Sequence, residues 1–233
     1  MPTRKDTFSN GCIYHIYNKT IDNRKIFNSD PVSLYFIELL NYYKSSKSNL
    51  KYSQFKNLNE DLRMNKEIEI SIPKYHNVEI LCHCLIPNHF HLLIKQKKEQ
   101  GIIRFMSNTI NSITHFYNLR NDRKGPVFFP QFKSRIILTD EALNHNSRYI
   151  HLNPYTCRLV GSLDELLNYR FSSFPAYINE GISNNEIVNP NIILANFNHD
   201  KSKYKEFVFG NAEHQKTLEY MKHLEDEKFV DVY

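Results

Sequence analysis

The stretch Ile86-Pro87-Asn88-His89-Phe90-His91-Leu92-Leu93-Ile94 carries two histidines, one residue apart, inside an apolar run. Residues i and i+2 of a β-strand point to the same face, so a strand here would present His89 and His91 side by side. Two neutral imidazoles on a rigid strand can bind a divalent metal and leave its other coordination positions open to oxygen ligands. The alternative is that both histidines are packed, hydrogen-bonded side chains of an ordinary strand.

The segment before this stretch is close enough to pair with it. Residues 78–85 form an apolar run and Pro87-Asn88 is a turn signal, which predicts a hairpin with a strand at 89–94. That hairpin would hold both histidines in the body of a sheet. Periodicity and capping signals predict further elements: a first strand at 11–17 and helices at 31–43, 101–118, 139–152 and within 204–229. Residues 44–66, rich in Lys, Ser and Asn, are expected to be a mobile connection with at most a short helix.

Length and composition indicate a globular protein. The 233 residues suit one domain, or one domain with appendages, and 41% hydrophobic residues can bury a core. No run of about 18 apolar residues is present, so no membrane span is expected. The first residues are followed by no apolar segment of the secretory type, which favours a cytoplasmic location.

The four cysteines, at positions 12, 82, 84 and 157, form no Cys-x-x-Cys pair. Reduced, buried thiols are the expected state of such residues in a cytosolic protein. A zinc site formed by Cys82, His83 and Cys84 is the alternative, although its spacing is unfavourable.

Positive charge is concentrated after the histidine pair. Residues 95–135 carry nine Lys or Arg and two acids, a net charge of +7 within a chain whose total is +5. A polyanion such as nucleic acid is the natural partner of such a segment, whereas the alternative is a solvated basic surface. Residues 127–138 combine three phenylalanines with Lys133 and Arg135. This mixture suits stacking on unpaired bases and binding of phosphates, although an ordinary amphipathic strand has it too.

The expected helix at 139–152 carries a candidate nucleophile. Tyr149 and Asn153 are four residues apart and therefore share a helix face near its C-terminal end, where Pro154 is expected to end the helix. A tyrosine in isolation is more often a packing residue. Tyr117 is a second candidate, but it belongs to the apolar stripe of the helix at 101–118.

Five motifs in order give the chain a family resemblance. They are Tyr14–Lys19, Ile86–Leu93, Gly125–Ser134, Arg148–Pro154 and Phe171–Ser173. Over roughly residues 7–178, the chain resembles the single-tyrosine HUH transposases, closest to the REP-associated tyrosine transposases. It departs from them at Gln131, where many relatives carry Arg, and at Phe129 and Phe174, near positions where relatives often carry Trp.

The resemblance implies a fold and a chemistry. The fold would be an α+β, ferredoxin-like HUH-endonuclease core in residues 1–180, with helices packed on a central antiparallel sheet, followed by a C-terminal extension of unknown role in residues 181–233. The activity would be cleavage and rejoining of single-stranded, hairpin-bearing DNA through a 5′-phosphotyrosine with Mg²⁺ or Mn²⁺. By motif, His89 and His91 match the metal-binding pair, Asn153 the third protein ligand and Tyr149 the catalytic tyrosine.

The positive segment supplies the candidates for DNA contact, which are Arg120, Arg123, Lys124, Phe132, Lys133 and Arg135. A chain bound to DNA in this way would be associated with the nucleoid. Two other functions stay open: a non-catalytic module that binds single-stranded or hairpin nucleic acid, and a metal-dependent hydrolase in which Tyr149 is structural. The resemblance is compatible with a monomer and with a homodimer.

Overall fold

The centre of the computed structural model, which describes residues 7–179, 187–219 and 221, is a four-stranded sheet. Its order is β2-β3-β1-β4, and all neighbouring strands are antiparallel. The strands are β1 (Ile13–Lys19), β2 (Val78–Ile86), β3 (His89–Gln96) and β4 (Lys133–Ile137). The expected central antiparallel sheet is confirmed, and the strand that carries the histidine pair is one of its two inner strands.

The predicted hairpin is formed by β2 and β3. Pro87 and Asn88 make the connection, and Ile86 pairs with His89 directly beyond it. Residues 80–86 and 90–94 are buried without interruption. Continuous burial of this kind is typical of a strand covered on both faces.

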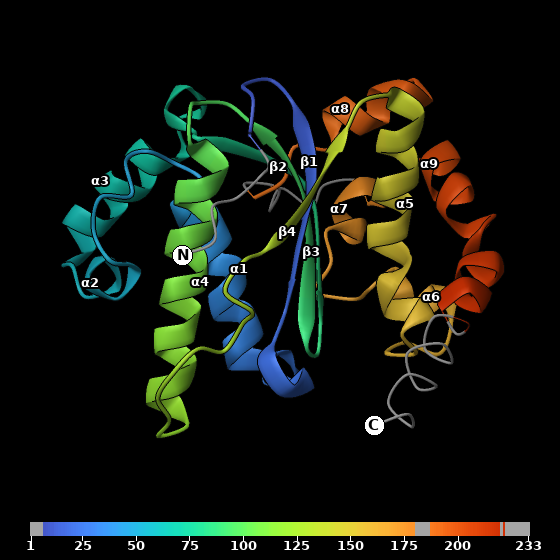
Figure 1. The fold of residues 1–233 in the computed structure, drawn as a ribbon. Helices are drawn as coiled ribbons and strands as arrows, with labels where there is room; N and C mark the ends of the chain where they lie inside the picture. The colour runs from blue at the N-terminus through green and yellow to red at the C-terminus, as the bar shows by residue number, and fades with distance from the viewer. Residues whose placement is uncertain (1–6, 180–186, 220, 222–233) are drawn as a thin grey trace.

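Helices do cover both faces of the sheet (Figure 1). On one side lie α1 (Asp30–Tyr43) and α4 (Gly101–Arg120), with α2 (Tyr52–Lys56) and α3 (Glu60–Ser71) outside them. On the other side lies α5 (Asp140–Thr156), with α9 (Lys201–Phe209) outside it. The short elements are η1 (Ile21–Asn23), η2 (Ile26–Asn28), η3 (Pro73–Tyr75), α6 (Leu163–Leu166), α7 (Phe174–Ile178), α8 (Asn191–Leu194) and η4 (Ala195–Phe197).

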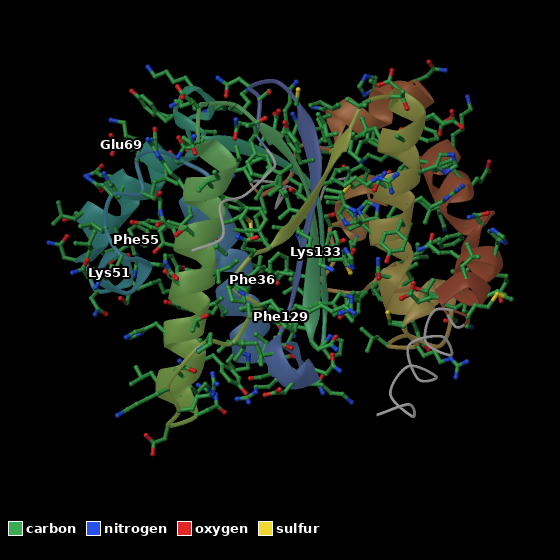
Figure 2. All side chains as sticks on the ribbon, in the orientation of Figure 1. Phe36, Lys51, Phe55, Glu69, Phe129 and Lys133 are labelled. Carbon is green, nitrogen blue, oxygen red and sulfur yellow. The ribbon has the colours of Figure 1, made fainter. Side chains whose placement is uncertain are left out.

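Each face of the sheet has its own hydrophobic core. Phe90 and Leu92 of β3 belong to the core beneath α1 and α4, where the Phe90 ring lies 5.0 Å from that of Phe36, which is labelled in Figure 2. Leu93 belongs to the core beneath α5. Because side chains alternate along a strand, His91 faces α5 as well.

Helix α5 begins where the sequence predicts and ends later. Thr139 caps it, since its hydroxyl accepts a hydrogen bond from the backbone N–H of Ala142 at 3.1 Å. The expectation that Pro154 ends the helix is wrong, because α5 continues to Thr156 with Pro154 inside. The last turn is buried against the core, and the Asn153 carbonyl accepts the N–H of Cys157 at 2.9 Å, so packing outweighs the bond that proline removes.

The connection expected at residues 44–66 is instead largely helical, since it contains α2 and the first part of α3. Its few apolar residues include Tyr52 and Phe55, whose rings are buried. Their ring centroids lie 5.1 and 4.7 Å from that of Tyr42. Asn59 caps α3 by accepting the N–H of Leu62 at 2.9 Å. Local packing and a cap therefore order a segment that is polar in composition.

Much of the expected C-terminal extension packs on the α5 side of the molecule. Tyr204 and Val208 of α9 are buried in the core beneath α5, and Val188 forms a parallel bridge with Ile80 of β2. The helix predicted within 204–229 corresponds to α9 and to helical residues 212–219, and its remaining part lies outside the described residues. In the described part of the chain, every helix is too short or too polar to span a membrane.

Candidate active site

The strand register assembles a row of functional side chains across the sheet. Tyr17 of β1 pairs with His91 on one side and with Lys133 on the other. In the same way, Lys19 of β1 pairs with His89. Cross-strand partners point to the same face, so these five side chains share the face that α5 covers.

The two histidines of β3 lie together as the alternation predicts. Their ring centroids are 5.0 Å apart and the rings are nearly perpendicular, at 86°. His91 is buried, with 5% of its surface exposed, whereas His89 is half-buried. The pair therefore opens toward solvent on the side of His89.

A hydrogen bond determines which nitrogen of His89 carries a proton. The Asn88 side-chain oxygen lies 2.7 Å from Nδ1 of His89. An amide oxygen only accepts, so Nδ1 donates and Nε2 carries the lone pair of the neutral ring. His89 is thus held in a tautomer that can bind a metal through Nε2.

A third imidazole contacts His91 from the neighbouring strand. Nε2 of His15, on β1, lies 2.9 Å from Nδ1 of His91, and the two ring centroids are 5.1 Å apart. Burial, with a further contribution from the positive charge of Arg135, lowers the pKa of His15 to about 4. His15 is therefore neutral at pH 7.

Tyr149 projects from α5 onto this cluster. Its ring centroid lies 5.5 Å from that of His91 at a right angle, and 6.1 Å from that of His15. Burial is the main reason that the pKa of its phenol is raised above the ordinary value near 10, and a hydrogen bond with the Asn153 side chain opposes this rise. The phenol is thus protonated at neutral pH.

Asn153 lies one turn after Tyr149 and is buried. Its side-chain nitrogen donates to the backbone carbonyl of Tyr149 at 2.8 Å, and its Oδ1 is the atom of this amide that can act as a metal ligand. The same carbonyl accepts a bond of 3.1 Å from the side-chain nitrogen of Gln215. Asn153 and Gln215 therefore fix the turn of α5 that holds Tyr149, and the ligand role of Asn153 stays a prediction.

The donor set at this place fits a hard or borderline divalent cation. Within residues 7–179, 187–219 and 221, no three His, Cys, Asp or Glu side chains are grouped to hold a metal. Two imidazoles and one amide oxygen would leave coordination positions for water and phosphate oxygens, which suits Mn²⁺ and admits Mg²⁺. His89 and His91 with Asn153 are the residues that would hold it.

The candidate DNA contacts divide into two groups. Lys133, visible in Figure 2, and Arg135 are exposed on β4, where Arg135 pairs with His15 beside the histidine cluster. Arg120 and Lys124 are exposed at the C-terminal end of α4 and in the loop after it. Arg123 donates to Asn118 Oδ1 at 2.6 Å and to the Pro126 carbonyl at 3.2 Å, bonds that fix the turn of this loop.

The aromatic residues of 127–132 are partly structural. The ordinary strand that was the alternative for residues 127–138 is regular only over β4. The Phe128 side chain is buried, and its ring centroid lies 5.7 Å from that of Phe90. Phe132 stacks on Phe8 with the ring planes 20° apart. Phe129, labelled in Figure 2, is 52% exposed and is the phenylalanine of this segment best placed to meet a base.

The described residues assemble neither the second candidate nucleophile nor the alternative zinc site into a functional arrangement. Tyr117 packs against the core beneath α1 and α4, on the face of the sheet opposite His91. Cys82 and Cys84 are free and buried, and burial raises the pKa of both thiols, that of Cys82 to about 12. Alternation along β2 turns His83 to the face opposite Cys82 and Cys84, so the three side chains of the alternative zinc site do not converge.

Sequence reasoning missed three residues of the cluster. His15, Tyr17 and Lys19 follow one another at i, i+2 and i+4 on β1, the spacing that places them on one face. The Tyr17 ring stacks near that of His91, with centroids 5.7 Å apart. The two-residue alternation along this segment can be read from the sequence. The pairing of β1 with β3, which brings these residues next to His91, cannot.

Comparisons with known proteins bear on the fold. No family model and no curated protein matches the chain. Among solved structures, it is similar to a REP-associated tyrosine transposase bound to a REP hairpin, at 15% identity and a TM-score of 0.50, over 81% of this chain and 94% of that chain. At this identity the likeness concerns architecture, and the chain has a mixed α and β fold, with a four-stranded antiparallel sheet, that matches a transposase-like HUH fold.

Proposed function

We propose that this protein is a strand transferase that cleaves and rejoins single-stranded DNA through Tyr149. The observation that carries the proposal is the position of the Tyr149 ring, 5.5 Å from His91 and on the same side of the sheet as His89. A nucleophile next to two imidazoles that can hold a cation is an arrangement suited to transesterification of a phosphodiester.

The reaction exchanges one phosphodiester for another. The Tyr149 phenol oxygen attacks the phosphorus, a bond forms between them, and the bond from phosphorus to the 3′-oxygen breaks. The phenol loses its proton and the departing 3′-oxygen gains one. The protein is left with a 5′-phosphotyrosine and the DNA with a 3′-hydroxyl, and attack by a 3′-hydroxyl reverses the step.

The chain's own residues would bind and orient the reactants. His89, His91 and Asn153 would hold Mg²⁺ or Mn²⁺, which when bound withdraws charge from the phosphate. Asn153 and Gln215 hold the Tyr149 turn of α5, while Lys19, Lys133 and Arg135 line the same face with positive charge. A hairpin-bearing substrate is supported by the similar transposase, whose structure contains a REP hairpin.

A covalent-capture experiment tests the proposal. The protein is mixed with labelled single-stranded hairpin oligonucleotides and Mn²⁺, and the products are separated under denaturing conditions. We expect a labelled adduct that forms with wild-type protein, is lost with EDTA and is absent in Tyr149→Phe. Tyr117→Phe is the matched control, because Tyr117 is also a helical tyrosine but lies on the other face, and it should form the adduct at the wild-type level.

The possible results separate the proposal from its alternatives. An adduct that persists in Tyr149→Phe would reassign the nucleophile. Free cleaved ends without an adduct would favour a hydrolase that uses water. Tight hairpin binding with neither product, across an oligonucleotide pool, would favour a non-catalytic binding protein on the same fold.

A further inference from the structure

We infer that His15 is a positioning residue that orients His91 for metal binding by accepting a hydrogen bond from the Nδ1–H of His91. This inference rests on the proposed function, because it concerns how the candidate metal ligand is held. It identifies a residue of the site outside the His-x-His motif, on a strand, 76 residues before His91 in the sequence.

The first support is geometric. His15 is 7% exposed and its Nε2 lies 2.9 Å from Nδ1 of His91, so the two rings are linked in the interior of the site. The His15 ring also contacts Tyr149 and Tyr17, at centroid distances of 6.1 and 5.2 Å. Rings on several sides restrict the rotation of His15 and fix the atom that it offers to His91.

The second support is chemical. One hydrogen lies between the two nitrogens, so only one ring donates in this bond. If His91 binds a cation through Nε2, that atom supplies a lone pair and the proton of the neutral ring is on Nδ1. His91 then donates and His15 accepts through Nε2, as histidine ligands commonly donate their second N–H to an outer partner.

The third support is the parallel with His89. Asn88 Oδ1 accepts from Nδ1 of His89 at 2.7 Å, so that ring already presents Nε2. With His15 as the acceptor for His91, both rings present the same nitrogen. Asn88 comes from the hairpin turn and His15 from β1, so two elements provide equivalent support.

Two substitutions separate positioning from packing. His15→Gln keeps an oxygen near the place of Nε2 and can still accept, whereas His15→Phe keeps the ring and removes the acceptor. Mn²⁺ affinity is measured by electron paramagnetic resonance of the free ion, without DNA. We expect His15→Phe to weaken Mn²⁺ binding about 10- to 100-fold and His15→Gln to remain within about threefold of wild type.

Adduct formation provides a kinetic readout of the same substitution. In His15→Phe, the Mn²⁺ concentration for half-maximal adduct formation should rise, while the rate at saturating Mn²⁺ stays near that of wild type. A purely structural role would instead lower the saturated rate or the amount of folded protein, which thermal unfolding measures. If His15→Phe does not fold, the tautomer of His91 is read in wild-type protein by nitrogen-15 NMR with saturating Mg²⁺.

Each result has a clear meaning. If His91→Ala abolishes Mn²⁺ binding and His15→Phe binds like wild type, the inference is wrong while the metal site stands. An NMR spectrum with the His91 proton on Nε2 also overturns it. If wild-type protein and His91→Ala bind Mn²⁺ equally weakly, the proposed function itself fails, and the inference fails with it.

Discussion

The environment of the Tyr149 hydroxyl conflicts with its proposed role as a nucleophile. A phenol attacks most readily as phenolate, yet burial among His91, His15 and Tyr17 disfavours the charged form and raises the phenol pKa. The free protein therefore holds the residue in its unreactive, protonated state. Under the proposed function, activation would have to come with the bound cation and substrate, and the site would be protected from reaction in their absence.

This environment predicts a pH dependence. Because the pKa of Tyr149 is raised above its ordinary value, the phenolate fraction grows throughout the range from pH 6 to 8. The single-turnover rate of adduct formation should rise by up to about tenfold per pH unit, without a plateau. Replacement of Tyr149 by 3-fluorotyrosine, whose phenol is more acidic, should move the curve to lower pH.

A plateau near pH 7 in the wild-type curve would contradict this expectation. It would indicate that a group with a pKa near neutrality, such as a histidine, limits the reaction instead. The fluorotyrosine curve would then coincide with that of wild type.

For single residues, the sequence predicts contacts within one strand but not contacts between strands. The proximity of His89 and His91 follows from two-residue alternation along a single strand. The contact of His15 with His91 depends on the register of β1 against β3, which joins residues 76 positions apart. Long-range register is set by the whole core, so local sequence reasoning could not place His15 beside His91.

Among the elements, β4 links the site to its proposed substrate. It is an edge strand of five residues, and Lys133 and Arg135 are exposed on it beside Tyr17 and His15. A single strand of DNA that reaches Tyr149 would pass near this edge. The basic residues of β4 are therefore expected to bind phosphates without reading the base sequence.

Substitution on β4 tests this role. Lys133→Ala and Arg135→Ala should each weaken hairpin binding for all sequences and reduce the slope of log affinity against log salt by about one. Lys56→Ala is the control, because Lys56 is on α2, in the outer layer on the opposite side of the sheet. Fluorescence anisotropy over a salt series measures both quantities, and equal slopes in all variants would exclude a phosphate contact at β4.

The elements also indicate where sequence patterns fail. The helices α1 and α5 were predicted from capping signals at their first residues, and α4 was predicted from its apolar stripe. The helices α2 and α3 were missed because a polar segment gives little periodic signal, although Tyr52 and Phe55 are buried and Asn59 caps α3. Pro154 was misjudged because only tertiary packing keeps the last turn of α5 helical.

Across the whole molecule, buried histidines make the fold sensitive to acid. Both ring nitrogens of His151 form hydrogen bonds, Nδ1 with the Tyr204 hydroxyl at 2.7 Å and Nε2 with the Ser173 hydroxyl at 2.9 Å. Within the described part of the chain, Nδ1 of His83 has no hydrogen-bond partner. Burial lowers the pKa of His83 to about 4 and that of His151 to about 3. Both side chains are therefore neutral in the folded protein at pH 7.

These values predict a loss of stability in acid. An unfolded histidine has a pKa of about 6.5, so between about pH 4 and 6.5 the unfolded chain binds more protons than the folded chain. The free energy of unfolding therefore falls as the pH falls, by about 2 kcal/mol for each of the two histidines between pH 7 and pH 5. Urea denaturation at the two pH values measures this loss.

His83→Leu isolates one of the two contributions. This variant lacks the titrating group, so its stability should fall by about 2 kcal/mol less than that of wild type over the same range. An identical fall in both proteins would mean that other groups control the acid response.

The C-terminal region is the part of the molecule that sequence reasoning described least. Residues 187–219 contribute Tyr204 to the core beneath α5 and Gln215 to the turn of Tyr149, but their short apolar patches resemble those of many surface segments. Which surface they cover follows only from the assembled fold. Residues 181–186, 220 and 222–233 of the expected extension lie outside the described residues.

The two edges of the sheet differ in what covers them. Along β2, Val188 bridges Ile80 and Ser172 bridges Cys84, and the Asn189 N–H donates to the Ile80 carbonyl at 2.9 Å. Strand β4 forms the other edge, and it is short and positively charged. Short strands and lysine or arginine side chains discourage the pairing of one chain's sheet with another's. The same two basic side chains that would attract nucleic acid therefore also protect the protein from edge-to-edge aggregation when no nucleic acid is bound.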